Sequence, residues 1–67
     1  MVKDPKKLVQ EIANEVGKPQ ARRLLVDEGI STSTADKLVR NRYQFEVGQL
    51  IKQAILRAYE AAKQQAS

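Results

Sequence analysis

The sequence predicts an all-α fold, with residues 1–67 forming one small domain built as a bundle of four helices. Two observations support this prediction. Apolar residues recur at helical spacing in four segments, and glycine, proline or hydroxylated residues separate those segments. No segment shows a convincing strand pattern, and no repeat, low-complexity stretch or linker divides the chain. At 67 residues, the chain is near the lower size limit for a core that needs no disulfide or metal.

The first helix is expected at residues 5–16. Asp4 precedes it and can cap its free amides, while Pro5 suits the first turn because an N–H there would have no helical partner. Gly17 follows the last apolar position and ends the helix. The side chains expected on its buried face form one stripe: Leu8, Val9, Ile12, Ala13 and Val16.

The second helix is expected to run from near Pro19 to near Glu28. Proline suits the first turn of a helix, and the glycine that follows Glu28 is a helix breaker. The side chains expected in the core are Ala21, Leu24 and Leu25.

The fourth helix carries the longest apolar stripe of the chain. Residues 42–45 are expected to form a loop with Phe45 in the core, and the helix is expected to run from near Glu46 into residues 61–62. Residues 63–67 are expected to fray. The stripe consists of Val47, Leu50, Ile51, Ala54, Ile55, Ala58 and Ala62. A stripe of this length fits either a dimer interface or a central helix within the monomer.

The segment from Gly29 to Arg40 gives the strongest indication of function. Gly29 can end a helix in the left-handed conformation, and Ser31 or Thr32 can cap the helix that follows. That third helix is expected at residues 33–41. Its apolar face would carry Ala35, Leu38 and Val39, and its opposite face Ser33, Asp36, Lys37 and Arg40. Short hydrogen-bonding groups followed by long cations suit a helix that contacts base edges and phosphates.

Residues 20–41 resemble the helix-turn-helix of the lambda-type Cro and repressor family. The run Gly29-Ile30-Ser31-Thr32-Ser33-Thr34-Ala35 matches the turn and the opening of the recognition helix. Leu24 and Leu38 stand at positions where that family keeps core residues. The chain departs from the pattern at Leu25, where the family usually has alanine, and just before the turn glycine, where it usually has an apolar residue instead of a glutamate.

The resemblance implies sequence-specific binding of double-stranded DNA, commonly as a homodimer, by a transcriptional repressor such as a phage Cro protein. The helix at residues 33–41 would enter the major groove. The side chains expected at base edges are Thr32, Ser33, Asp36 and Lys37. The side chains expected at phosphates are Gln20, Arg23, Arg40, Asn41 and Arg42.

Two of the candidate residues have a second interpretation. Asp36 fits a first-turn acid stabilised by the helix dipole at least as well as a group that accepts a hydrogen bond from cytosine. Tyr43 fits a loop tyrosine packed on the fourth helix as well as a phosphate ligand.

The composition favours a polyanionic partner. Lysine and arginine outnumber aspartate and glutamate by 12 to 8, which gives a formal charge of +4. The aromatic residues are Tyr43, Phe45 and Tyr59 alone, so no platform for stacking unpaired bases is expected. Duplex DNA therefore fits better than single strands or RNA.

The composition also limits the chemistry. The chain has no cysteine and no histidine, so thiolate and imidazole groups are missing for metal binding and for nucleophilic catalysis. No glycine-rich phosphate loop is present. We therefore expect no enzyme activity, metal site or cofactor. The short apolar runs and the missing signal-peptide pattern predict a cytoplasmic protein without a membrane span.

A function from another class is also compatible with the sequence. In this alternative the chain is a small helical adaptor, or an antitoxin, that docks a protein partner on the stripe of its fourth helix while the basic residues serve solubility. The two hypotheses differ in one geometric requirement. DNA binding requires Arg23, Lys37, Arg40 and Arg42 to form one continuous surface, and the adaptor does not.

Overall fold

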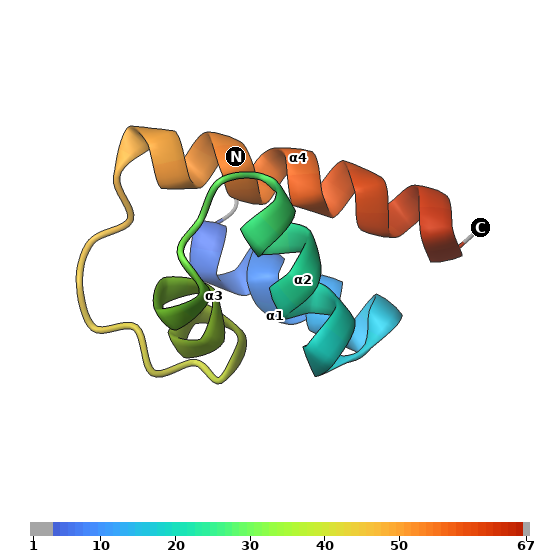
Figure 1. The fold of residues 1–67 in the computed structure, drawn as a ribbon, viewed down its shortest axis with the longest axis horizontal. Coiled ribbons are helices and arrows are strands. Elements are labelled where there is room, and N and C mark those ends of the chain that lie inside the picture. Colours follow the sequence, from blue (N-terminus) through green and yellow to red (C-terminus); the bar gives the residue numbers. More distant parts are fainter. Residues whose placement is uncertain (1–3, 67) are drawn as a thin grey trace.

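The structure, a computed structural model, describes residues 4–66 and shows four helices and no strand in that range. The helices are α1 (Pro5–Val16), α2 (Lys18–Asp27), α3 (Thr32–Val39) and α4 (Gln49–Ala66). α4 lies along α1 and α2 packs against both, whereas α3 packs on α1 and α2 without reaching α4 (Figure 1). The predicted all-α fold with four helices is confirmed.

α1 and α2 meet at a corner formed by the single residue Gly17. Asp4 caps α1 as predicted, because its carboxylate accepts a hydrogen bond from the Lys6 amide at 2.9 Å. At the other end, the Gly17 amide donates to the Ala13 carbonyl (2.8 Å), and the Gly17 carbonyl accepts from the Ala21 amide (2.9 Å). Its φ of 88° and ψ of 155° lie in a region that is essentially restricted to glycine. Gly17 therefore ends one helix and starts the next.

α2 ends in a left-handed turn at Gly29, as predicted, with a φ of 99°. The Ile30 amide donates to the Leu25 carbonyl at 3.2 Å, a bond typical of glycine-terminated helices. Ile30 and Leu25 are both buried. The turn therefore directs the chain from α2 back into the core before α3 begins.

Ser31 is the cap of α3. Its hydroxyl oxygen accepts a hydrogen bond from the Thr34 amide at 3.3 Å, and the same hydroxyl lies 2.9 Å from the Thr34 hydroxyl. Of the two predicted caps, Ser31 is thus the one used, and Thr32 is the first residue of the helix. α3 begins one residue earlier than predicted.

One core joins all four helices. Its largest fully buried side chains are Val9, Ile12, Leu25, Leu38 and Ile55. The predicted burial of Ala21, Leu24 and Leu25 in α2 and of Ala54, Ile55, Ala58 and Ala62 in α4 is confirmed. In α1, Leu8, Val9 and Ile12 are buried, whereas Ala13 and Val16 are only half-buried.

The prediction was wrong at the beginning of α4. The helix starts at Gln49 and not near Glu46, and Phe45 and Leu50 are 69% and 81% exposed. Phe45 lies in the preceding loop, where its ring meets the Tyr43 ring edge-on at a centroid distance of 5.8 Å. Leu50 lies in the first turn of α4, and the backbone of α3 does not come close to α4. No helix covers either side chain, so the apolar pattern alone predicts more burial than the fold provides.

The end of α4 is longer than predicted. The helix continues to Ala66 instead of fraying from Lys63. The Lys63 ammonium lies 4.7 Å from the centre of the Tyr59 ring, and Gln20 of α2 donates a hydrogen bond to the Gln65 side chain at 3.3 Å. The first contact supports the last turns within α4, and the second joins them to α2. None of the described helices, α4 included, is long and apolar enough to cross a membrane.

Candidate nucleic-acid interface

α3 presents one polar face to solvent. Its buried side chains are Ala35, Leu38 and Val39, as predicted. On the other side, Thr32, Ser33 and Lys37 are exposed, and Asp36 is half-buried. Three of the four side chains predicted at base edges are therefore accessible to a large ligand.

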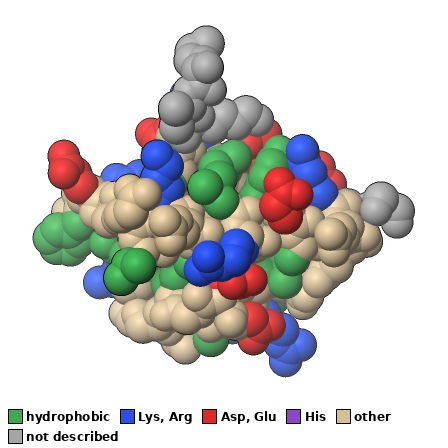
Figure 2. Space-filling view, turned by 90° about the horizontal axis from the view of Figure 1, so that it is seen from above, with side chains coloured by type: hydrophobic (Ala, Val, Ile, Leu, Met, Phe, Trp, Pro, Cys, Tyr) green, Lys and Arg blue, Asp and Glu red, His purple; other side chains and the backbone are tan. Residues whose placement is uncertain are grey.

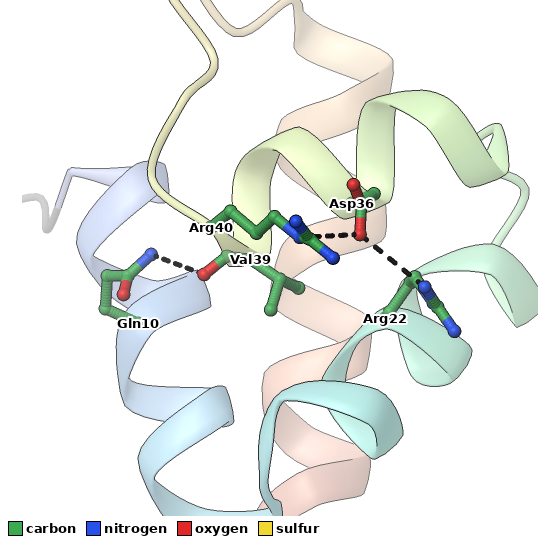
Figure 3. Close-up of polar contacts among 5 residues, drawn as sticks. All are labelled: Gln10, Arg22, Asp36, Val39 and Arg40. Carbon is green, nitrogen blue, oxygen red and sulfur yellow. Dashed lines mark hydrogen bonds and ion pairs between the residues drawn. The ribbon is translucent and has the colours of Figure 1, made fainter.

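The C-terminal end of α3 is held by its own turn and by α1. Asn41 adopts a left-handed φ of 59°, and the Arg42 amide donates back into the last turn at 2.8 Å. Gln10 of α1 donates to the carbonyls of Leu38 (3.0 Å) and Val39 (3.3 Å; Figure 3). α3 therefore ends two residues earlier than predicted, and the backbone of Asn41 makes the turn.

A groove of about 440 Å³ opens between this end of α3 and the start of α2, and we term it the basic groove. Its lining consists of Lys18, Pro19, Arg22, Asp36, Val39, Arg40 and Arg42. Arg40 and Arg42 were predicted phosphate ligands, whereas Lys18 and Arg22 were not. The spacing of Lys18 and Arg22 places them on one face of α2, but the sequence does not reveal that this face meets the end of α3.

Asp36 lies between two arginines of the basic groove (Figure 3). Its Oδ1 atom is 3.2 Å from Nε of Arg40, one turn along α3, and 3.5 Å from a terminal nitrogen of Arg22 on α2. Asp36 lies beyond the first turn of α3, where the helix dipole no longer acts strongly, so the dipole interpretation is wrong. Its carboxylate is instead the link between two helices.

The ion pairs of Asp36 with Arg22 and Arg40 are open to solvent. The side chains of Asp36, Arg22 and Arg40 are 36%, 46% and 59% exposed. Ion pairs between exposed side chains contribute only about 0.2–1 kcal/mol to stability. Loss of these ion pairs would therefore cost the domain little stability.

Two of the remaining predicted phosphate ligands, Gln20 and Arg23, lie further along α2. Arg23 and Gln20 line a shallow hollow that shares Arg22 and Pro19 with the basic groove. Arg22 thus connects Arg23 to the basic groove along one side of the molecule. Lys37 lies outside both hollows, three residues before Arg40 on the exposed side of α3.

A second groove, of about 330 Å³, opens at the other end of α3, and we term it the apolar groove. It is lined by Glu28, Gly29, Ile30, Ser31, Thr34, Leu50, Ile51, Ala54 and Arg57. Nε of Arg57 in α4 lies 3.0 Å from Oε2 of Glu28. This ion pair gives Glu28 a partner at the position where the Cro and repressor family usually has an apolar residue.

The face seen from above α4 mixes side-chain types (Figure 2). Hydrophobic side chains form separate spots between lysines, arginines and acids, and one spot projects at the edge where the loop between α3 and α4 lies in Figure 1. No continuous basic patch is visible on this face, in contrast to the basic groove.

Tyr43 lies in the loop between α3 and α4 and is half-buried. The Lys6 ammonium of α1 lies 5.7 Å from the centre of its ring, and Phe45 packs edge-on against it. These contacts tie the loop to α1 and stabilise the segment that follows Arg42.

Among the described residues, no group of three or more side chains suited to metal binding occurs, and no buried polar side-chain atom is without a partner. Comparison of the chain with protein-family models, curated proteins and solved structures gave no match. The chemistry that the described arrangement offers is recognition of an anionic surface, since an exposed polar helix face ends beside four cations.

Proposed function

We propose that this protein binds double-stranded DNA in a sequence-specific manner and regulates transcription, as a repressor of the Cro type. In this proposal α2, the turn at residues 28–31 and α3 act as a helix-turn-helix, and α3 enters the major groove. The observation that carries the proposal is the exposed polar face of α3 running into the basic groove.

Each part of this surface has a separate role in the proposal. Thr32, Ser33 and Lys37 face base edges, because they are exposed and lie on the side of α3 opposite the core. The cations of the basic groove contact phosphates, which fix the position of the protein on the duplex. Gln20, Arg23 and Asn41 extend the phosphate contacts along α2 and beyond α3.

The proposal includes a homodimer on DNA. The eight residues of α3 extend over about 12 Å, enough for about three or four base pairs, so one copy reads too short a sequence to be selective. Two copies related by a twofold axis would place their recognition helices about 34 Å apart, one turn of the duplex.

We place the second copy on the apolar groove and its neighbour Leu50. A twofold interface brings the same patch of each copy together. The basic groove would repel itself in such a contact, whereas the apolar groove carries the balanced pair Glu28–Arg57 beside exposed apolar groups. The same groove also supports the second candidate function, an adaptor or antitoxin that docks a different protein.

Selection of bound sequences from a pool of random duplexes tests the function directly. We expect enrichment of a two-fold symmetric sequence. Titration of that duplex at several salt concentrations should give a slope of log K against log salt of about −4 to −7, as expected for five to eight phosphate contacts. Absence of duplex binding at low salt would refute the proposal and leave the adaptor as the better hypothesis.

A further inference from the structure

We propose that the basic groove is a binding site for one phosphate group and that Asp36 is its internal competitor. In the free protein the Asp36 carboxylate occupies the anion position between Arg22 and Arg40, and a phosphate of the DNA backbone takes that position on binding. The identity of the phosphate as part of a duplex rests on the proposed function.

The side chains that line the basic groove carry more positive charge than Asp36 balances. Four cations line it, and Asp36 is the one carboxylate in the lining. Lys18 and Arg42 are exposed and contribute to the excess positive charge. The groove therefore retains an attraction for anions even while Asp36 is in place.

The geometry shows that Asp36 and a phosphate would use the same donors. Nε of Arg40 and a terminal nitrogen of Arg22 both approach Oδ1 of Asp36, at 3.2 and 3.5 Å. A guanidinium group binds carboxylate and phosphate oxygens with the same fork of N–H donors. A phosphodiester of the DNA backbone carries one negative charge and two unesterified oxygens, like a carboxylate, so it fits the same donors. Its neighbours along the strand add further negative charge, which the other cations of the groove can engage.

Competition with Asp36 also lets the site discriminate between a single small anion and a polyanion. Because the site is filled by a weak internal anion, a ligand gains only the difference between its own interaction and that of Asp36. Single small anions are thus held weakly, and a polyanion that engages the rest of the interface at the same time displaces Asp36 more readily.

Substitution of Asp36→Asn tests this mechanism, because the amide keeps the shape of the side chain and removes its charge. Glu60→Gln is the control, since it removes the carboxylate of an exposed residue of α4 that lines neither groove. Both variants raise the net charge by one. Any effect of net charge alone is therefore common to the two.

Binding to a random-sequence duplex is measured for the wild type and both variants by fluorescence anisotropy at several salt concentrations. We expect Asp36→Asn to bind about fivefold more tightly, the order of effect of one unit charge at about 4 Å in a water-like medium. Glu60→Gln should change binding less than twofold. Equal effects of the two variants, or weaker binding by Asp36→Asn, would overturn the proposal.

A titration with inorganic phosphate separates this proposal from the DNA function. The side-chain Nε–H signals of Arg22 and Arg40 are followed by NMR in the wild type and in Asp36→Asn. Larger shifts at lower phosphate concentration in the variant support the internal competitor, even if no duplex binds. Identical titration curves in the two proteins overturn it, even if the duplex binds.

Discussion

α3 separates two grooves that are similar in size and differ in charge. The basic groove at its C-terminal end measures about 440 Å³, and the apolar groove at its start about 330 Å³. Each is bordered by an arginine–carboxylate pair that joins two helices, Arg22–Asp36 in one and Arg57–Glu28 in the other. They differ in the charge that remains, because the basic groove has three further cations and the apolar groove has none.

This difference shows how one short helix can serve two partners. The basic groove attracts a polyanion and repels a second copy of itself, whereas the apolar groove offers Leu50 and a balanced ion pair for contact with an uncharged surface. A protein that binds DNA as a dimer needs both kinds of surface at the same time. In the proposed function, the basic groove therefore binds phosphates and the apolar groove binds the second copy.

The largest effect is expected from removal of two cations from the basic groove. The double variant Arg22→Ala and Arg40→Ala should weaken binding to any duplex by about 100-fold at moderate salt, because each lost charge-assisted contact costs on the order of tenfold. The slope of log K against log salt should become shallower by about one, because the two arginines share one phosphate. Fluorescence anisotropy with a labelled duplex at several salt concentrations measures both quantities.

Arg57→Ala is the matched control for this experiment. Arg57 and Arg40 have side chains that are equally exposed, at 59%, and each pairs with one carboxylate. Arg57 borders the apolar groove, so its removal should change affinity for a single half-site, where no second copy binds, less than about threefold and leave the salt slope nearly unchanged. An equal loss in both variants would mean that only net charge matters and that the two grooves do not differ in function.

The limits of α1 and the end of α2 were predictable because they depend on local chemistry. Asp4, Gly17 and Gly29 each act on backbone groups within a few residues, and the structure shows all three in their predicted roles. The buried face of α2 was predictable for a similar reason, since a stripe at helical spacing in a short helix has one way to face a core. These features need no knowledge of how the helices pack.

The grooves were not predictable because they depend on the packing of distant helices. The sequence shows that Lys18 and Arg22 share a face of α2, but only the crossing of α2 and α3 brings them beside Asp36. In the same way, an apolar stripe marks Leu50 as a core candidate without showing that no other helix packs over its side chain. Burial of a stripe requires a neighbouring element, and its position is a tertiary property.

The second largest effect is expected at the apolar groove. Leu50→Lys places a charge on each side of the proposed twofold contact and should weaken binding to a duplex with two half-sites by about tenfold, through loss of the contact and like-charge repulsion. Binding to a single half-site should not fall, since Leu50 lies away from the basic groove. Footprinting and gel-shift titrations of both duplexes give the comparison.

Leu56→Lys adds the same charge elsewhere on α4. Leu56 is also an exposed large apolar residue, but it does not line the apolar groove. We expect it to leave the cooperativity between half-sites unchanged. If Leu50→Lys behaves like Leu56→Lys, and the wild type protects only one half-site at saturation, the second copy does not use this groove.

The smallest effect is expected from two serines at the start of α3, for which we propose different tasks. Ser31 caps the helix through the Thr34 amide, whereas Ser33 is exposed and has no part in that cap. Ser31→Ala should lower the free energy of unfolding by about 1 kcal/mol and leave the ratio of specific to non-specific DNA binding unchanged. Ser33→Ala should leave the melting temperature nearly unchanged and reduce that ratio about fivefold, as expected for one lost contact to a base edge.

The two variants thus give opposite patterns in the same pair of measurements, thermal unfolding and competition between the selected duplex and random DNA. Both replace a serine by alanine in or next to the first turn of α3, so the small gain in helix propensity is similar in each. A fall in the binding ratio for Ser33→Ala alone locates base recognition on the exposed start of α3, between the two grooves. If Ser33→Ala changes neither quantity, the start of α3 does not read bases, and any sequence preference has to come from Lys37 or from the shape of the duplex.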